Sequence, residues 1–218
     1  MLDETMRAAE REWLDKFSLG PTEREGCGLP VGTPAPDFTL PDHEGRQRRL
    51  SEFWSTGPAL LMFWRHFGCL CGVARTARLR AEYQSYADAG LNPVIVGQGE
   101  PTRAAAYRSE HELACPVLCD PEHRVFRAYG IGQWPVERVL YGAPAEFWSH
   151  PREIGAQFQD SRRAGGRPPV DDPWRAVAEY VIGSDGLVRL AYMYQYCEDF
   201  PNPAVLTTAA ALSRFTSS

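Results

Sequence analysis

The stretch that decides the fold is Phe63-Trp64-Arg65-His66-Phe67-Gly68-Cys69-Leu70-Cys71-Gly72. The apolar run Ala59–Trp64 predicts a buried strand that leads into it, and the helical periodicity of Gly72–Ala89 predicts a helix that follows it. Two cysteines therefore lie where a strand turns into a helix. Free amide groups and the positive end of the helix dipole stabilise a thiolate at such a position, so a thiol pKa there falls below its usual value of about 8.5.

Cys69 and Cys71 are consequently the candidate catalytic residues, because the thiolate is the reactive form of cysteine in nucleophilic chemistry. Arg65 and His66 stand just upstream and could add positive charge to the turn, so we count them with the catalytic set. A disulfide between Cys69 and Cys71 would close a very small, strained ring. Such a bond suits thiol–disulfide exchange better than storage.

Two alternative interpretations of this turn stay open. In the first, both cysteines are small buried residues at a helix start. In the second, His66, Cys69 and Cys71 form part of a metal-ligand set, although no second cluster at zinc-like spacing completes it. The sequence thus predicts neither a metal nor another bound cofactor.

Working outward, short apolar runs alternate with helical periodicity from Ala35 onward, which predicts an α/β layered fold with a central sheet flanked by helices. The sequence Ser184-Asp185-Gly186 predicts a hairpin turn, so the last two strands are antiparallel and the sheet is mixed. The further strands are expected at Pro93–Val96, Pro116–Leu118, Ala178–Ile182 and Val188–Tyr194, and the further helices at Thr102–His111 and about Ala204–Phe215.

The N-terminal part forms a separate unit in this interpretation. Residues 2–17 have the pattern of an amphipathic helix, which Gly20 and Pro21 end. We divide the chain into a helical extension with a linker, residues 1–30, and a main domain, residues 31–218. The helix packs either on its own chain or against a second copy, so a homodimer is one expectation.

Residues 133–173 do not fit the alternation, because they carry no strand signal. We interpret them as an insertion before the last hairpin. Its aromatic residues Trp134, Phe147 and Trp148 could cover the pocket as a lid. Its basic run Arg162-Arg163 is interpreted as a solvated face rather than an anion site.

Several motifs accompany the cysteine turn in a fixed order: Val31–Leu40, Cys115–Pro121, Tyr129-Gly130-Ile131 and Val181–Gly186. With these motifs the chain resembles the thioredoxin-like superfamily, and within it the peroxiredoxin-like AhpC/TSA family, over roughly residues 31–215. The resemblance implies a thioredoxin fold of the peroxiredoxin-like type, in which 31–40 is the opening strand. It also implies thiol chemistry at the cysteine turn.

The departures from that family affect the expected activity. Peroxiredoxins carry Pro-x-x-x-Thr-x-x-Cys, whereas here Met62 and His66 stand at the Pro and Thr positions relative to Cys69. The resemblance therefore implies slow peroxide reduction. Thioredoxins carry Cys-x-x-Cys, and the Cys-x-Cys of this chain leaves the register ambiguous by one residue. Which of Cys69 and Cys71 attacks first stays open.

Other cysteines are candidates for the same site. In the thioredoxin topology the last hairpin returns to the active-site end, so Cys197 is expected within about 15 Å of Cys69. It either resolves an intermediate or lines the pocket. Cys119 ends a strand at the same edge, but its neighbour Asp120 is expected to raise its pKa, and we interpret it as a packing residue.

The expected pocket walls are aromatic. Trp64 and Phe67 flank the turn, and Tyr194, Tyr196 and Phe200 would add an apolar wall suited to an organic substrate. Peroxiredoxins use an Arg near the position of Arg175, but the spacing differs by about two residues, so a solvated surface position is favoured for Arg175.

Composition excludes other classes. A net charge of −5 has the wrong sign for a general nucleic-acid binder. There is no run of 18 apolar residues and no secretory signal at the N-terminus, so we expect a cytoplasmic protein without membrane contact.

The sequence favours a thiol–disulfide oxidoreductase or thiol-dependent peroxide reductase that acts on a disulfide or a peroxide and is regenerated by an external thiol reductant. The alternative is a non-catalytic thioredoxin-like binding module whose insertion recognises a ligand or protein.

Overall fold

A five-stranded mixed sheet forms the centre of the computed structural model, which describes residues 4–144, 151–167 and 171–213. Its strands lie in the order β5 (Val117–Cys119), β4 (Asn92–Gly97), β3 (Ala59–Phe63), β6 (Ala178–Ile182) and β7 (Val188–Met193). β3 pairs in parallel with β4, which pairs in parallel with β5, whereas β3–β6 and β6–β7 are antiparallel. The predicted mixed sheet and the predicted final hairpin are thus confirmed.

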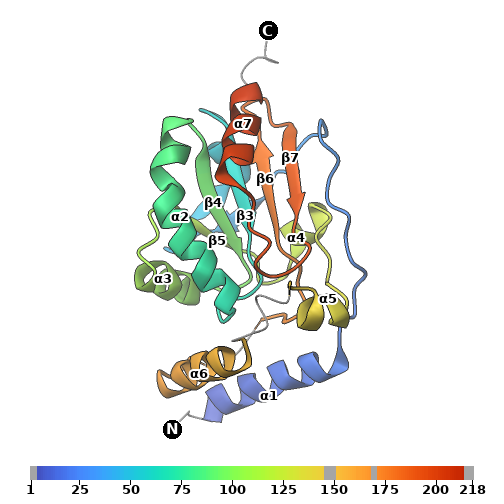
Figure 1. The fold of residues 1–218 in the computed structure, drawn as a ribbon. Helices are drawn as coiled ribbons and strands as arrows, with labels where there is room; N and C mark the ends of the chain where they lie inside the picture. Colours follow the sequence, from blue (N-terminus) through green and yellow to red (C-terminus); the bar gives the residue numbers. More distant parts are fainter. Residues whose placement is uncertain (1–3, 145–150, 168–170, 214–218) are drawn as a thin grey trace.

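The central strand β3 is buried on both faces, because each face carries its own layer of helices. Side chains alternate along a strand, so Leu60 and Met62 point to one face and Leu61 and Phe63 to the other. The first pair packs with residues of α2 (Leu70–Asp88), α3 (Pro101–Glu110) and α7 (Pro203–Ser213), and the second with residues of α4 (Arg124–Ala128). Figure 1 shows α2 and α7 side by side over one face of the sheet.

Two strands end one residue earlier than the sequence predicted. β3 ends at Phe63 and β7 at Met193, so Trp64 and Tyr194 lie just beyond the sheet. Both residues remain buried there. β3 and β7 run in the same direction with β6 between them, so Trp64 and Tyr194 follow the sheet at the same end and are available as walls of a site there.

The expected opening strand over residues 31–40 is wrong in extent. Within it only Thr39 and Leu40 belong to a strand, β1 (Thr39–Pro41), which pairs with β2 (Gln47–Arg49) in a separate two-stranded sheet that precedes the short 3-10 helix η1 (Leu50–Phe53). Before β1 the structure shows one isolated bridge, Pro34 to Leu187. Proline has no amide hydrogen, so a segment with Pro34 and Pro36 cannot sustain a continuous ladder.

The insertion 133–173 forms helices, α5 (Val136–Tyr141) and α6 (Pro151–Ala164), and no strand among its described residues. α6 lies beside α1 (Glu4–Leu19) at one end of the sheet, while α7 lies toward the opposite end (Figure 1). Arg163 of α6 pairs with Glu10 of α1 at 2.5 Å. None of the described helices has both the length and the apolar character that a bilayer span requires.

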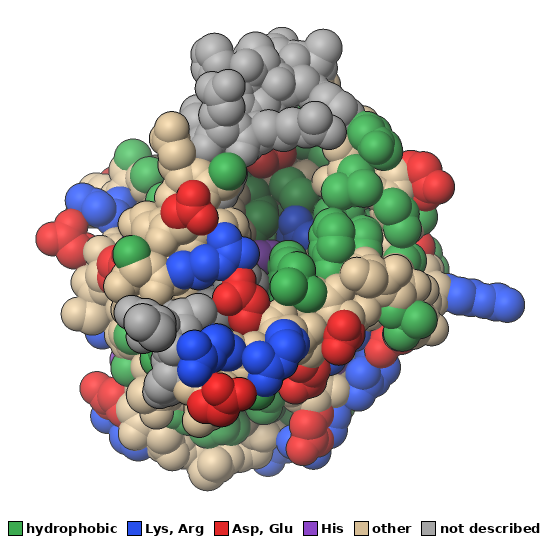
Figure 2. Space-filling view, turned by 90° about the horizontal axis from the view of Figure 1, so that it is seen from below, with side chains coloured by type: hydrophobic (Ala, Val, Ile, Leu, Met, Phe, Trp, Pro, Cys, Tyr) green, Lys and Arg blue, Asp and Glu red, His purple; other side chains and the backbone are tan. Residues whose placement is uncertain are grey.

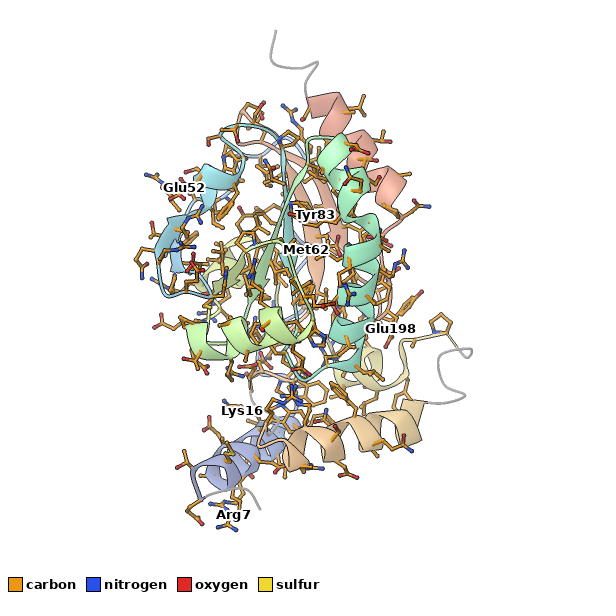
Figure 3. All side chains as sticks on the ribbon, turned by 90° about the vertical axis from the view of Figure 1, so that its left-hand side faces the viewer. Arg7, Lys16, Glu52, Met62, Tyr83 and Glu198 are labelled. Carbon is orange, nitrogen blue, oxygen red and sulfur yellow. The ribbon has the colours of Figure 1, made fainter. Side chains whose placement is uncertain are left out.

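The N-terminal helix α1 packs on its own chain through aromatic side chains. Trp13 meets the ring of His66 edge to face at 6.3 Å, and Phe17 stacks on Trp174 at 4.9 Å. Figure 3 shows Lys16 on the part of α1 near the rest of the molecule and Arg7 at its far part. α1 therefore covers the same end of the sheet as the cysteine turn.

Candidate active site

The cysteine turn connects the central strand β3 to the first turn of α2, as predicted. Cys69 is the residue before the helix and has an extended backbone, φ −86° and ψ 132°, while Cys71 is its second helical residue. The amide of Gly72 donates to the carbonyl of Cys69 at 3.1 Å and closes the first turn. Cys69 is partly exposed and Cys71 is buried.

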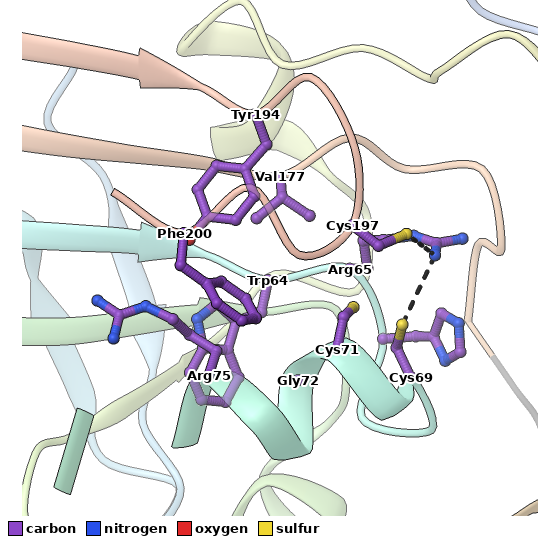
Figure 4. A pocket seen from close by; sticks show the side chains of 11 residues that line it. Trp64, Arg65, Cys69, Cys71, Gly72, Arg75, Val177, Tyr194, Cys197 and Phe200 are labelled. Atoms are coloured by element: carbon purple, nitrogen blue, oxygen red, sulfur yellow. Dashed lines mark hydrogen bonds between the residues drawn. The ribbon is translucent and has the colours of Figure 1, made fainter. Parts of the chain in front are cut away.

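Cys197 joins the same site from the other end of the sequence. It lies in the loop between β7 and α7, and the Sγ atoms of Cys69, Cys71 and Cys197 are all within 4.8 Å of one another. The predicted proximity of Cys197 to Cys69 is confirmed, and the three residues are referred to below as the thiol cluster. Figure 4 shows the three sulfur atoms converging from the helix start and from the loop.

Arg65 connects two members of the thiol cluster. Its Nη1 donates to Cys197 Sγ at 3.0 Å and to Cys69 Sγ at 3.6 Å, the two dashed lines of Figure 4. Its Nη2 donates to the carbonyl of Pro173, and the guanidinium lies 5.9 Å from the ring centroid of Trp134. The side chain is buried and forms no ion pair with a carboxylate among the described residues. The positive charge expected from Arg65 therefore lies next to the sulfur atoms of Cys69 and Cys197.

This arrangement places the negative charge of the thiol cluster on Cys69. Hydrogen bonds from Cys197 and then from Cys71, together with the positive charge of Arg65, lower the pKa of Cys69 well below its usual value although burial opposes them. The same hydrogen bonds to Cys197 and Cys69, with burial, raise the pKa of Cys71 well above its usual value. The hydrogen bond to Cys69 also raises the pKa of Cys197 to about 12. The electrostatics thus favour Cys69 as the attacking thiolate, a point that the sequence left open.

A small cavity of ≈ 20 Å³ adjoins the thiol cluster, lined by Trp64, Arg65, His66, Cys69, Cys71, Gly72, Arg75, Val177, Tyr194, Cys197 and Phe200. A space of this size holds about one water molecule. Tyr194 and Phe200 line the cavity as expected and Tyr196 does not, and the cavity has no room for a whole organic substrate. Only the reacting end of a substrate fits beside the sulfurs.

The molecule is hollowed on its α1 and α6 side. Figure 2 views this face and shows a depression with a hydrophobic wall and with basic and histidine side chains at its depth. Figure 3 shows Glu198, the neighbour of Cys197, at the same end of the main body. The thiol end of the sheet is therefore the recessed end of the molecule.

His66 contributes no positive charge, contrary to the expectation. Burial, with the neighbouring charges of Arg65 and Arg162, lowers its pKa to about 4, so the imidazole is neutral at pH 7. Its Nδ1 is buried without a hydrogen-bond partner among the described residues. His66 lines the cavity as a neutral wall that rests on Trp13.

Arg175 is neither solvated nor in the thiol site. It is 1% exposed, and its Nη1 donates to Glu23 at 2.6 Å while its Nη2 lies 3.1 Å from Asp172. It also contacts His123 Nδ1 at 3.1 Å. Together these side chains line a second, larger cavity of ≈ 450 Å³ beside the C-terminal end of α1. Two carboxylates hold this guanidinium, which explains how it can be buried.

The remaining cysteines lie outside the thiol cluster. Burial, followed by the charges of Glu100 and Asp42, raises the pKa of Cys119 to about 12. The expected direction is confirmed, but the expected cause, Asp120, is wrong, because that carboxylate accepts hydrogen bonds from the first amides of α4. Burial likewise raises the pKa of Cys115 to about 12, and Cys27 is exposed.

The insertion supports the cysteine turn through its basic and polar side chains. Arg162 Nη1 donates to the carbonyl of Phe67 at 2.9 Å, and Gln159 Nε2 donates to the carbonyl of Gly68 at 3.0 Å. The expectation of a solvated Arg162 is therefore wrong, because it satisfies a buried carbonyl of the turn. A Cβ on Gly68 would lie 2.9 Å from the guanidinium carbon of Arg162, so a larger residue here would push this side chain aside.

The aromatic residues near the turn have different roles from those expected. Phe67 does not line the cavity, since it stacks on Tyr107 at 4.7 Å and packs over Gly97 and Gly99. Trp134 is buried in the core rather than in a lid. The other two aromatics of the expected lid, Phe147 and Trp148, lie outside the described residues.

Sequence reasoning missed two groups of this site. Arg75 binds the fully buried Glu179 with Nε and Nη2, at 2.8 and 3.2 Å, and Tyr194 donates to the same carboxylate at 2.5 Å, which fixes the tyrosine wall of the cavity. Burial, then the charge on Cys69, raises the pKa of Glu198. A charged pair between a helix and a strand has no local sequence signal. For Glu198 the only available sequence signal was its position next to Cys197.

Three sulfur atoms so close together are also a donor set for a soft cation. The Arg65 guanidinium, however, occupies two of the sulfurs and brings a positive charge to them. This geometry favours a thiolate held by arginine over one that ligates a cation.

The comparisons with known proteins agree with this geometry. The AhpC/TSA family model matches residues 31–153, more than half of the chain. The thiol-disulfide oxidoreductase ResA of Geobacillus thermodenitrificans is 31% identical over 117 residues, which are 53% of this chain and 66% of ResA. A putative peroxiredoxin of Mycobacterium tuberculosis is 30% identical over 115 residues, covering 52% of this chain and 70% of the relative.

Solved structures share the fold. Peroxidoxin BcpB from Mycobacterium tuberculosis superposes with a TM-score of 0.58 at 18% identity, covering 89% of this chain and 100% of that one. A mutant of the peroxiredoxin 6 of Arenicola marina gives 0.62 at 12% identity, covering 88% and 76%. These neighbours confirm the thioredoxin-like fold of the peroxiredoxin type. The chain therefore belongs to the AhpC/TSA family, and its named relatives are oxidoreductases.

Proposed function

We propose that this protein is a thiol oxidoreductase that uses Cys69 as its nucleophile, reduces a disulfide or a peroxide, and is regenerated by an external thiol. The single observation that carries the proposal is the Arg65 guanidinium, bonded to Cys69 Sγ and to Cys197 Sγ without a carboxylate among the described residues to neutralise it. A buried positive charge needs a negative partner. The thiolate of Cys69 supplies it.

The reaction begins with attack by the Cys69 thiolate. On a disulfide, a bond forms between Cys69 Sγ and one substrate sulfur, the substrate S–S bond breaks, and one thiol leaves. On a peroxide, the S–O bond forms, the O–O bond breaks, and Cys69 becomes a sulfenic acid. A second thiol then attacks Cys69 Sγ and closes a protein disulfide. The Cys-x-Cys spacing makes Cys71 the first candidate for that step.

Two departures from the peroxiredoxin pattern support disulfides over peroxides as substrates. The residues that shape the peroxide pocket in peroxiredoxins are replaced by Met62, which is buried in β3, and by the neutral His66. Preorganised donors around a developing charge typically contribute about a hundredfold each to the rate. Peroxide reduction is expected to be correspondingly slow in stopped-flow measurements with the reduced protein.

Alkylation of the reduced protein tests the proposal. Iodoacetamide should label one thiol rapidly at pH 6 to 7, and peptide mapping should identify it as Cys69, because its pKa lies well below the usual value. Cys69→Ser should remove the rapid phase and the thiol-coupled turnover. Cys115→Ser is the matched control, since Cys115 is buried and outside the thiol cluster.

The binding-module alternative makes the opposite forecast. Passive thiols would react slowly at every neutral pH. If the double change Cys69→Ser with Cys71→Ser left turnover intact, the proposed centre would be wrong.

A further inference from the structure

Cys197 and Cys71 are both close enough to Cys69 to capture its oxidised form, but the structure makes them unequal. From the geometry we infer that Cys197, rather than Cys71, forms the disulfide with Cys69 during turnover. The inference rests on the proposed role of Cys69 as the nucleophile and adds the identity of its resolving partner.

The first argument is the backbone that each thiol would have to move. A disulfide requires the two sulfurs to approach about 2.05 Å. Cys69 is the extended residue just before α2 and Cys71 is the second residue of that helix, so both sulfurs are carried by the backbone of the helix start. Joining them disturbs the hydrogen bond from the Gly72 amide to the Cys69 carbonyl. Such a bond therefore competes with the helix start that stabilises the thiolate.

Cys197 has more freedom. It lies in the loop that follows β7, and the hydrogen bonds of that loop are local, from the Gln195 amide to Asp199 at 2.8 Å and from the Asp199 amide to Tyr196 at 3.3 Å. Movement of Cys197 toward Cys69 breaks neither a strand pair nor a helical turn. Cys197 is also partly exposed, whereas Cys71 is buried.

The second argument is the position of Arg65. Its Nη1 is 3.0 Å from Cys197 Sγ and 3.6 Å from Cys69 Sγ, and no hydrogen bond to Cys71 is present among the described residues. While Cys69 is a thiolate, its charge opposes ionisation of Cys197. Once Cys69 is a mixed disulfide or a sulfenic acid, it carries no charge. The same guanidinium then stabilises the thiolate of Cys197 and makes it the next nucleophile.

The resolving step balances in both cases. Cys197 loses its proton to solvent, its sulfur attacks Cys69 Sγ, and the new S–S bond forms. From a mixed disulfide the departing group is the second substrate thiolate, which takes up a proton; from a sulfenic acid it is hydroxide, which leaves as water. Two protein thiols are oxidised, and one substrate disulfide or peroxide is reduced. Cys71 remains a thiol throughout.

A chromogenic aromatic disulfide tests this inference by stoichiometry. All variants are made in a Cys27→Ser background, because the exposed Cys27 would release an aryl thiolate of its own. Each reduced protein molecule should then release two aryl thiolates, the first through Cys69 and the second through the resolving thiol. Cys197→Ser should release only the first rapidly and keep the aryl group on Cys69, with the second release slowed at least tenfold. Cys71→Ser should release both, and peptide mapping of the wild-type protein should show a Cys69–Cys197 disulfide. Cys119→Ser serves as the matched control outside the thiol cluster.

Failure of the inference differs from failure of the proposed function. Second release at the wild-type rate from Cys197→Ser, with a Cys69–Cys71 disulfide in the wild type, would overturn the role of Cys197 and leave Cys69 as the nucleophile. Unchanged first release from Cys69→Ser would overturn the proposed function itself. Wild-type behaviour of both Cys197→Ser and Cys71→Ser also contradicts the inference, because it shows that either thiol suffices.

Discussion

Two buried arginines, Arg65 and Arg175, lie at the same end of this molecule and have opposite surroundings. Arg175 is held by the carboxylates of Glu23 and Asp172. Arg65 donates to two cysteine sulfurs and one carbonyl and forms no ion pair among the described residues. The guanidinium of Arg175 is paired with carboxylates. The charge of the Arg65 guanidinium is compensated only when a cysteine of the thiol cluster ionises.

This difference separates a structural arginine from a reactive one. The carboxylates of Glu23 and Asp172 compensate the buried charge of Arg175 without providing a nucleophile. Hydrogen bonds from Cys197 and Cys71, together with the positive charge of Arg65, lower the pKa of Cys69, so this arginine helps to make a reactive thiolate. The following predictions test the contrast, starting with the largest expected effect.

Replacing the structural arginine should affect stability most. Arg175→Met leaves Glu23 and Asp172 without their guanidinium, and breaking such a buried pair costs about 3–5 kcal/mol. Urea denaturation should show this loss. Alkylation of Cys69 in the folded variant should proceed at the wild-type rate. A slower alkylation would mean that the two arginine sites are coupled.

Replacing the reactive arginine should affect chemistry more than stability. In Arg65→Met the pKa of Cys69 should rise because the guanidinium no longer favours the thiolate, and the alkylation rate at pH 7 should fall about tenfold or more as the thiolate fraction falls. The rate as a function of pH measures this shift. Arg65→Lys should recover part of the rate; if it recovers none, charge alone is insufficient and the two-sulfur geometry of the guanidinium is required.

His66 should make the folded state sensitive to acid. Its pKa falls from 6.5 in the unfolded chain to about 4 in the folded protein, so the unfolded state binds more protons between these values. Stability is therefore highest above pH 6.5 and declines as the pH falls toward 4, by about 1–2 kcal/mol between pH 6.5 and 5. His66→Gln should lose less stability over this range in urea titrations. An equal loss would assign the acid sensitivity to another group.

The contact between the insertion and the cysteine turn should give the smallest effect. Gly68→Ala places a Cβ 2.9 Å from the Arg162 guanidinium carbon. Overpacking typically costs about 1–3 kcal/mol, and the lower value applies because the guanidinium is the far end of a flexible side chain. Thermal denaturation should show the loss in the wild-type background and not in Arg162→Ala. If both backgrounds lose the same amount, the clash lies elsewhere.

The sequence predicted the five strands of the central sheet, the helices α1, α2, α3 and α7, and the cysteine turn because these depend on local patterns. Apolar residues of β3 and the helical period of α2 are visible within a short window, and the turn between them carries Cys69 and Cys71. The predicted opening strand did not form around Pro34 and Pro36. The family pattern matched there, but proline lacks the amide hydrogen that strand pairing needs. The prediction of a positive charge on His66 was wrong because the burial of this side chain depends on α1 and on neighbours distant in sequence.

By itself, the sequence of this protein determined a thiol pair at the junction of a strand and a helix, since helix dipole and free amides are properties of the chain within a few residues. Only the tertiary structure decided that Cys69 is the thiol whose ionisation is favoured and that Cys197 lies close enough to react with it. Cys197 is separated from Arg65 by more than a hundred residues, yet it shares that guanidinium with Cys69. Sulfur acidity is set by charges and hydrogen bonds within a few ångströms, and only the folded sheet brings the loop after β7 to the start of α2.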